Sequence, residues 1–343
     1  MSRVPFVHLH VHTEYSLVDS TVRIPALMKK CAEQHMPAVA LTDQNNVFGL
    51  VKFYRKAMAA GIKPIIGADL RVYNADDASR PYTLVLLVQD AAGFRKLSEL
   101  ITRAYIEGQY RGEPMVRREW LDADSCAGLI ALSGGLHGDI GHALHANHRD
   151  VALKLLDGWL EVFPGRFYLE LMRTGRSGED NCVRASLELA TETGTPVVAT
   201  NDVRFLEQDD FNAHEARVCI HEGRVLADPD RPRNYSRQQY LRSAEEMAEL
   251  FADAPEALAN TVEIARRCSL DLQLGTSVLP AFPVPEGQTE AAYLEAEARR
   301  GLGAALERIF AARDIPEQRR AAFRAPYQQR LEHELGVIQS MGF

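Results

Sequence analysis

Short runs of apolar residues alternate with amphipathic segments from Phe6 to about Thr200. Such alternation is typical of βα units built around a parallel sheet. The apolar runs predict seven strands, at residues 6–12, 38–43, 63–73, 82–88, 128–133, 167–171 and 196–201. Because helical patterns separate these runs and no GxGxxG follows the first, the chain is expected to form an irregular α/β barrel of the TIM type rather than a dinucleotide-binding sheet.

After Asp202 the pattern becomes mostly helical. Ser243 and Glu246 predict a capping box at the start of a short helix, and a second helix is expected over 255–268. The Pro- and Gly-containing stretch at 275–287 has the composition of a linker.

Two further amphipathic helices are predicted beyond the linker, at 289–310 and at about 325–339. The second carries an apolar stripe formed by Leu331, Leu335 and Ile338, for which the sequence offers no obvious partner. We therefore expect the chain to be part of a longer protein.

The composition is that of a globular protein, with 46% hydrophobic and 25% charged residues. No apolar run approaches membrane-spanning length and no signal pattern opens the chain, so a cytoplasmic protein without a membrane partner is expected. The five cysteines lie far apart without a CxxC pair, which argues against disulfides and against a thiolate zinc site. A net charge of −8 excludes binding to nucleic acid by bulk electrostatics.

One basic stretch interleaves cations with two tyrosines, as a phosphate backbone or a protein partner would require. Its cations are Arg231, Arg233, Arg237 and Arg242. The alternative is that these side chains are simply solvated.

The strongest candidate chemistry lies at the predicted strand ends. His8, His10 and His12 alternate along the first strand, so a regular strand would place all three on one face. Asp43, Asp69 and Asp202 end three other strands, and in barrels of this kind such ends meet at one rim. Imidazoles with carboxylates suit Zn²⁺, Mn²⁺ or Fe, which activate water for phosphoester hydrolysis. Taken singly, each Asp has an alternative role as a helix cap, and each His as an ordinary hydrogen-bonded side chain.

The chain resembles the PHP (polymerase and histidinol phosphatase) domain that opens the alpha subunit of bacterial DNA polymerase III. The resemblance covers the whole chain and rests on a set of motifs, including Ala-Leu-Thr-Asp at 40–43 and Val-Ala-Thr-Asn-Asp at 198–202. The other matching segments are 6–19, 46–54, 61–67, 131–134, 213–215 and 260–265. The family fold is a distorted (βα)7 barrel. The resemblance thus implies a PHP domain at 1–270, followed at 271–343 by the beginning of the polymerase palm region.

Intact family members hold three metals with nine ligands. Carried over by position, His10, His12, Asp19 and Asp202 match ligands, and Asp69 stands where Glu is usual. The departures are Gln44, Thr83, Gly135 and Arg204, where the family has His, His, Cys and His. We therefore expect no three-metal cluster, and a site that is empty or holds at most one Zn²⁺ or Mn²⁺.

Arg204 is the most informative of these departures. A guanidinium is permanently cationic and cannot ligate a metal, but it can offset carboxylates that cations once neutralised. We expect Arg204 to bridge Asp202 and either Asp19 or Asp69, in place of a metal. The alternative is that its side chain points to solvent.

The resemblance implies that the parent protein is a DNA-directed DNA polymerase using Mg²⁺ on palm aspartates that lie beyond Phe343. Alone, these residues should not polymerise. They are expected to act as a scaffold that docks the proofreading exonuclease subunit. Primer-template DNA, the sliding clamp and other replisome subunits are expected partners of the parent protein.

Two alternatives remain open on the sequence. One is a PHP phosphoesterase or 3′–5′ exonuclease with a reduced metal site at His10, His12, Asp19, Asp69 and Asp202. The other is a free-standing enzyme resembling histidinol phosphatase, against which the helical residues after Gly275 argue.

Overall fold

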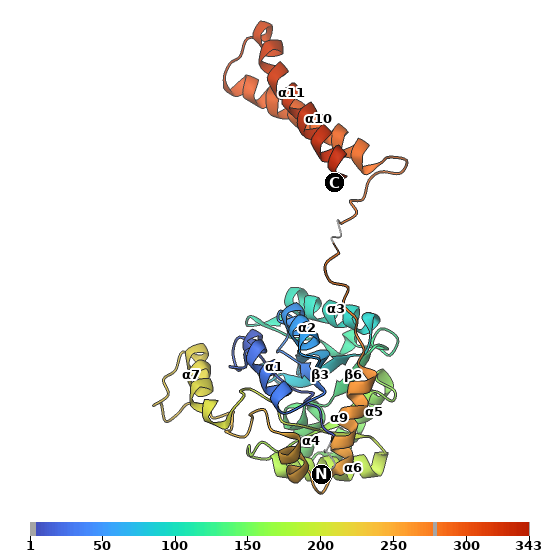
Figure 1. Cartoon of the computed structure of the whole chain (residues 1–343), viewed down its shortest axis with the longest axis vertical. Helices are drawn as coiled ribbons and strands as arrows, with labels where there is room; N and C mark the ends of the chain where they lie inside the picture. Colours follow the sequence, from blue (N-terminus) through green and yellow to red (C-terminus); the bar gives the residue numbers. More distant parts are fainter. Residues whose placement is uncertain (1–4, 277–279, 343) are drawn as a thin grey trace. The chain divides into compact units, whose positions relative to one another are not determined.

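The computed structural model describes residues 5–276 and 280–342. The chain forms two compact units, Met1–Asp271 and Leu272–Phe343 (Figure 1). All strands in the described part of the chain belong to the first unit, and the second is helical.

The first unit is built on a six-stranded sheet in the order β1-β2-β3-β6-β7-β8. Its strands are β1 (Ala38–Leu41), β2 (Lys63–Val72), β3 (Tyr82–Val88), β6 (Leu129–Leu132), β7 (Phe167–Met172) and β8 (Val197–Thr200). All neighbours pair in parallel except β3, which is antiparallel to both β2 and β6. The expectation of crossover helices between all strands is therefore wrong at β3, because β2 and β3 form a hairpin. A short hairpin of β4 (Gln109–Tyr110) and β5 (Glu113–Pro114) was not predicted.

The predicted first strand, residues 6–12, links the two edges of this sheet without forming a regular strand. On one side His8 bridges Val39, and on the other Val11 bridges Val203. The amide of Ala40 donates to the carbonyl of His8 at 2.9 Å, and the amide of Val203 donates to the carbonyl of His10 at 3.1 Å. The α/β barrel with seven contributing segments is thus confirmed.

Helices surround the sheet (Figure 1). They are α1 (Ile24–Glu33), α2 (Leu50–Ala59), α3 (Ala91–Glu107), α4 (Asp139–His145), α5 (Arg149–Val162), α6 (Glu179–Thr193), α7 (Phe211–Glu222), α8 (Ala244–Leu250) and α9 (Pro255–Arg267), with short 3-10 turns at Glu14–Ser16, Arg118–Trp120, Gly135–His137 and Gln208–Asp210. The capping box of Ser243 and Glu246 opens α8 as predicted. No helix in the described ranges is long and apolar enough to cross a membrane.

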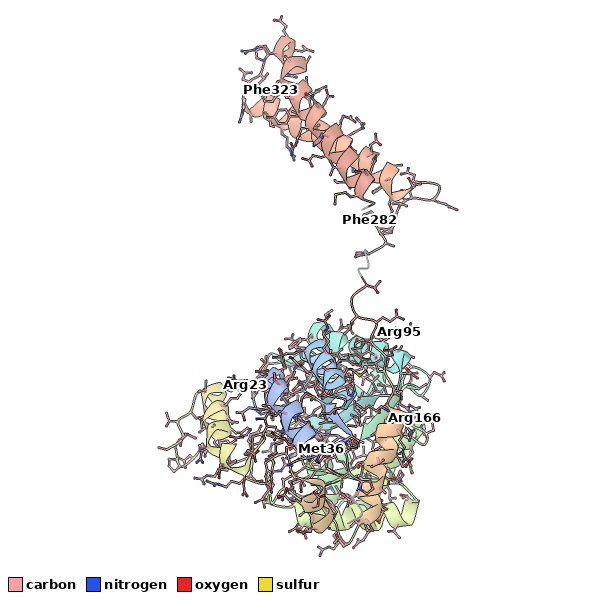
Figure 2. All side chains as sticks on the ribbon, in the orientation of Figure 1. Arg23, Met36, Arg95, Arg166, Phe282 and Phe323 are labelled. Atoms are coloured by element: carbon pink, nitrogen blue, oxygen red, sulfur yellow. The ribbon has the colours of Figure 1, made fainter. Side chains whose placement is uncertain are left out.

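The barrel core is a buried apolar cluster to which every strand of the large sheet contributes, together with residues 6–12 and α9. It includes Val7, Leu9, Ala40, Ile65, Val85, Ile130, Tyr168, Val198 and Ile264. Arg166 (Figure 2) joins the start of β7 to β6, because its Nη1 donates to the carbonyl of Leu129 at 2.8 Å. The five cysteines are buried free thiols, as the sequence predicted.

The second unit is a pair of helices, α10 (Glu290–Ala312) and α11 (Glu317–Met341). Leu306 and Phe310 of α10 and Leu335 of α11 are buried, and Phe323 (Figure 2) packs edge-on against Phe310 with ring centroids 5.8 Å apart. The stripe that contains Leu335 therefore has a partner in α10, which corrects the expectation drawn from the sequence.

Candidate metal centre

The predicted ligand residues meet in a buried cluster at the mouth of the barrel. His10 and His12 come from residues 6–12, Asp69 from β2, and Asp202 from the turn after β8, while Asp19 follows the first 3-10 turn. Each is at most 2% exposed. The cluster opens into a cavity of about 950 Å³ that is also lined by Arg71, His137 and Tyr235.

The two imidazoles face each other through their Nε2 atoms, which lie 3.3 Å apart. Asp69 Oδ2 is 3.3 Å from His12 Nε2 and 3.7 Å from His10 Nε2. Asp202 Oδ1 is also 3.7 Å from His10 Nε2. Ligand atoms of His10, His12 and Asp202 all lie within 4.8 Å of one another, so these side chains can converge on one cation.

Glu170 of β7 is a member of this cluster that the sequence analysis missed. Its Oε1 accepts a hydrogen bond from Thr200 Oγ1 at 2.6 Å and lies 2.9 Å from His10 Nδ1. Its Oε2 accepts from the amide of Gly134 at 3.0 Å. A lone carboxylate inside the apolar run Phe-Tyr-Leu-Glu-Leu-Met was the signal that could have revealed it.

Arg204 is 6% exposed and lies between two of the carboxylates. Its Nε donates to Asp202 Oδ1 at 2.7 Å, and its Nη1 donates to Asp19 Oδ2. The same Nη1 lies 2.9 Å from His12 Nδ1. Within the described structure the side chain therefore points into the cluster rather than to solvent.

A second arginine and two polar side chains complete the surroundings, and the sequence analysis missed all three. Arg176 Nη1 donates to Asp202 Oδ2 at 2.9 Å, and Gln239 Nε2 donates to the same oxygen at 2.9 Å. Tyr235 donates its hydroxyl to Asp19 Oδ2 at 3.1 Å. They reach the site from loops far along the chain, so no local pattern predicts the contacts.

The charges of the cluster compensate one another. Burial alone would raise the pKa of Asp19 and Asp202, yet Arg204 holds both pKa values below the usual range. Burial would likewise lower the pKa of His10, but Glu170, Asp69 and Asp202 outweigh it and raise that pKa to about 10. These carboxylates therefore favour the protonated form of His10.

Two sequence candidates lie outside the cluster. Asp43 accepts hydrogen bonds from the Thr13 amide at 2.6 Å and from Ser16 Oγ at 2.7 Å, so it holds the turn beside His12. His8 Nε2 lies 2.9 Å from the carbonyl of Arg242, away from the other histidines. The expectation that three histidines share a face is wrong, because residues 6–12 do not keep the alternation of a regular strand.

Three of the four arginines of the basic stretch contact their own chain. Arg231 forms an ion pair with Glu215, Arg237 lies over the ring of Phe211 at 5.6 Å, and Arg242 Nη1 donates to the Tyr240 hydroxyl at 3.1 Å. Arg233 is exposed. Contact of this stretch with nucleic acid or a partner stays a prediction.

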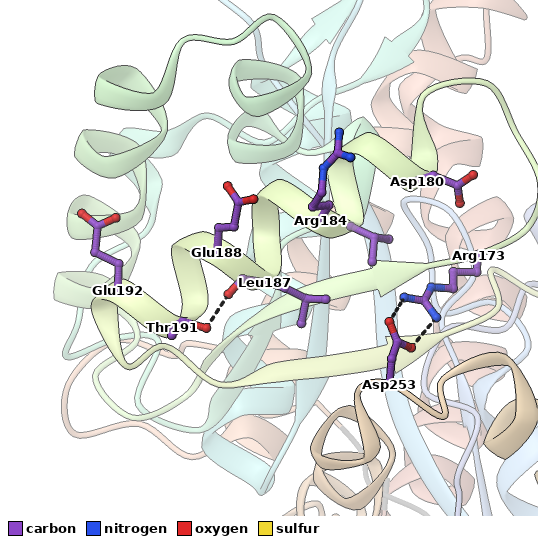
Figure 3. Close-up of a pocket in the computed structure, with 9 residues that line it drawn as sticks. Arg173, Asp180, Arg184, Leu187, Glu188, Thr191, Glu192 and Asp253 are labelled. Atoms are coloured by element: carbon purple, nitrogen blue, oxygen red, sulfur yellow. Dashed lines mark hydrogen bonds and ion pairs between the residues drawn. The ribbon is translucent and has the colours of Figure 1, made fainter.

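A second groove, of about 720 Å³, lies along α6 (Figure 3). Arg173 crosses its end and donates to the two carboxylate oxygens of Asp253 at 2.6 and 2.7 Å. Val183 and Leu187 line it together with several charged residues of α6. None of the residues that line it belongs to the histidine cluster.

The residues present fit one divalent cation and not three. Ligand atoms arranged tetrahedrally around Zn²⁺ lie roughly 3.3–3.6 Å apart, close to the 3.3–3.7 Å separations between the two imidazoles and Asp69. Asp69 Oδ1 is also buried without a hydrogen-bond partner among the described residues. Further cations are disfavoured because Arg204 fills the space between Asp19 and Asp202, and because Thr83 Oγ1 accepts from Arg71 instead of offering an imidazole.

Comparisons with known proteins give one family match and long sequence relatives. Residues 8–174 match the PHP domain. The DNA polymerase III subunit alpha of Pseudomonas aeruginosa is 51% identical over 340 residues, which cover 99% of this chain and 29% of that protein. The corresponding subunit of Escherichia coli K12 is 48% identical over 343 residues, 100% of this chain and 29% of that protein.

The chain thus spans 29% of the length of these curated relatives. Among solved structures, an amidohydrolase from Chromobacterium violaceum aligns with a TM-score of 0.41 and 14% identity, covering 62% of this chain and 96% of that one. Residues 8–174 are thus similar to the PHP domain, and along its length the chain is similar to the N-terminal region of bacterial DNA polymerase III alpha subunits.

Proposed function

We propose that this chain is the N-terminal part of a cytoplasmic replicative DNA polymerase whose Mg²⁺-dependent synthesis resides in residues outside it. The identity of 51% over 99% of the chain to a polymerase subunit supports this proposal. Primer-template DNA, the sliding clamp and other replisome subunits would be partners of the whole protein. The purified full-length protein should extend a primed template, whereas residues 1–343 alone should not. Extension by residues 1–343 would contradict the proposal.

Within that protein the PHP domain acts as a scaffold rather than as a three-metal hydrolase. The observation that carries this step is the position of Arg204, bonded to both Asp19 and Asp202. A guanidinium supplies positive charge to these carboxylates but offers no lone pair to a metal. The cluster can thus keep its fold without the cations that hydrolysis needs.

The scaffold docks the separate proofreading exonuclease subunit. Such a subunit would supply the nuclease activity that the PHP site lacks. The parent protein would then not need a complete metal site in its PHP domain. Immobilised residues 1–343 should retain the purified exonuclease subunit, and the same matrix carrying an unrelated protein of similar charge should not. Equal recovery from both matrices would remove the docking role.

A second candidate function is a phosphoesterase or 3′–5′ exonuclease with one cation, favoured by the convergence of His10, His12 and Asp202. These side chains and Asp69 would hold the cation, which when bound polarises water and phosphoryl oxygens. This candidate predicts Mn²⁺- or Zn²⁺-dependent cleavage of a phosphodiester that His12→Ala abolishes. The scaffold proposal predicts no cleavage above that of His12→Ala.

A further inference from the structure

The carboxylate of Glu170 makes more polar contacts than a side chain that only fills space in the core would need. Its side chain is inaccessible, and its carboxylate contacts β8 through Thr200, the turn after β6 through Gly134, and residues 6–12 through His10. Its own amide donates to Ser133 Oγ at 2.9 Å. Burying a carboxylate destabilises a fold unless hydrogen bonds satisfy its oxygens. An apolar residue would fill the same space with a smaller desolvation penalty.

The contact with His10 has a directional consequence. Glu170 Oε1 lies 2.9 Å from His10 Nδ1, so a proton on this ring nitrogen would be donated to the carboxylate. His10 Nε2 is then the ring atom directed at His12 and Asp69. A carboxylate behind the distal ring nitrogen is how metal-binding histidines are oriented and made more basic.

We propose that Glu170 is the positioning residue of a single divalent-cation site formed by His10, His12 and Asp69 with Asp202. Glu170 lies outside the ligand set that the family resemblance implies, and it acts through His10 rather than by touching the cation. The proposal rests on the reduced site described above. Because the ligands come from residues 6–12, β2 and the turn after β8, such a cation would join the segment that closes the barrel to two other elements.

The test is the zinc affinity of the intact 343-residue chain, measured by competition with a chromogenic chelator. Glu170→Gln keeps the volume of the side chain but removes the charge, and should weaken Zn²⁺ binding about 10- to 100-fold. Asp139→Asn is the matched control, because Asp139 is a partly buried carboxyl on the same cavity that accepts from Trp159 and, in the described structure, contacts none of the ligands. It should bind Zn²⁺ like the unmodified chain. Equal affinity of Glu170→Gln and Asp139→Asn would overturn the proposal.

Two further readouts decide the matter if Glu170→Gln does not fold. Thr200→Val removes one hydrogen bond to Glu170 and should weaken Zn²⁺ binding several-fold. If Thr200→Val binds Zn²⁺ as tightly as the unmodified chain, the result counts against Glu170 as the positioning residue. In the unmodified chain with Zn²⁺ added, imidazole ¹⁵N shifts should show His10 protonated at Nδ1 and metal-bound at Nε2. The opposite assignment, or no Zn²⁺ binding at all, would overturn the inference. None of these outcomes depends on whether the exonuclease subunit docks.

Discussion

At the scale of single residues, Arg204 is the centre of the site's charge interactions. Arg204 donates hydrogen bonds to Asp19 and Asp202 and lies close to His12 Nδ1. Arg176 donates to the other carboxylate oxygen of Asp202. The sequence predicted Arg204 because the family pattern marks the position. It could not predict Arg176 or Tyr235, since nothing near them in the chain indicates that their loops reach the barrel mouth.

Replacing Arg204 should leave the buried Asp19 hydrogen-bonded to the Tyr235 hydroxyl but without an arginine partner, and should leave Asp202 with Arg176 as its one remaining arginine partner in the described structure. We expect Arg204→Met to lower the free energy of unfolding by about 3–5 kcal/mol, the usual cost of removing one partner of a buried ion pair. Urea denaturation followed by circular dichroism measures the change. Arg233→Met, at an exposed position, should unfold like the original chain. An unaltered denaturation curve for Arg204→Met would show that the guanidinium does not support the fold.

His8 predicts a loss of stability on acidification. Burial lowers the pKa of His8 from 6.5 to about 4, and its ring lies against the carbonyl of Arg242. In the unfolded chain this histidine is protonated below about pH 6.5, whereas in the folded chain it is protonated only below about pH 4. Stability therefore falls as the pH drops from 6.5 to 4. The shift corresponds to roughly 3 kcal/mol.

His8→Gln should reduce the decline between pH 6.5 and 4, because glutamine keeps a donor for the Arg242 carbonyl and does not titrate. His221→Gln, at an exposed histidine, should leave the decline unchanged. Melting temperatures at several pH values make the comparison. Identical pH profiles for His8→Gln and the original chain would refute the assignment of this decline to His8.

At the scale of elements, the apolar runs predicted which segments form strands but not their direction. The segment at 73–81 carries no helical pattern, and Asn74 ties it into a turn by bonding the Asp76 amide and the Arg80 carbonyl. That absence of a helix was the sign that β3 runs antiparallel to β2. The irregular backbone at 6–12 could not be foreseen, because it arises from pairing with two separate edges.

The packing of α3 on the start of β6 depends on Gly93. A Cβ atom at Gly93 would lie 1.8 Å from the carbonyl oxygen of Gly128, which is backbone and cannot move aside. We expect Gly93→Ala to destabilise the fold by about 3 kcal/mol or to prevent folding. Gly301→Ala, in α10 with open space around it, should instead be neutral or stabilise its helix by up to about 1 kcal/mol. Equal and small effects of the two substitutions on urea unfolding would show that the close approach is absent.

At the scale of the whole molecule, the residues at the barrel mouth are held together by hydrogen bonds and ion pairs among their own side chains. Most of the cluster could be predicted, since His10, His12, Asp19, Asp69 and Asp202 do come together. Glu170 was not predicted, because a strand residue becomes part of the site only when the first segment folds across it. Three arginines of the basic stretch likewise contact their own chain, at Glu215, Phe211 and Tyr240.

The number of cations that the intact chain holds tests this account most directly. The chain should be equilibrated with excess Zn²⁺ or Mn²⁺, freed of unbound metal by gel filtration, and analysed by native mass spectrometry and elemental analysis. We predict no more than one cation per chain, because Arg204 occupies the space between Asp19 and Asp202. Two or three cations retained per folded chain would contradict the account.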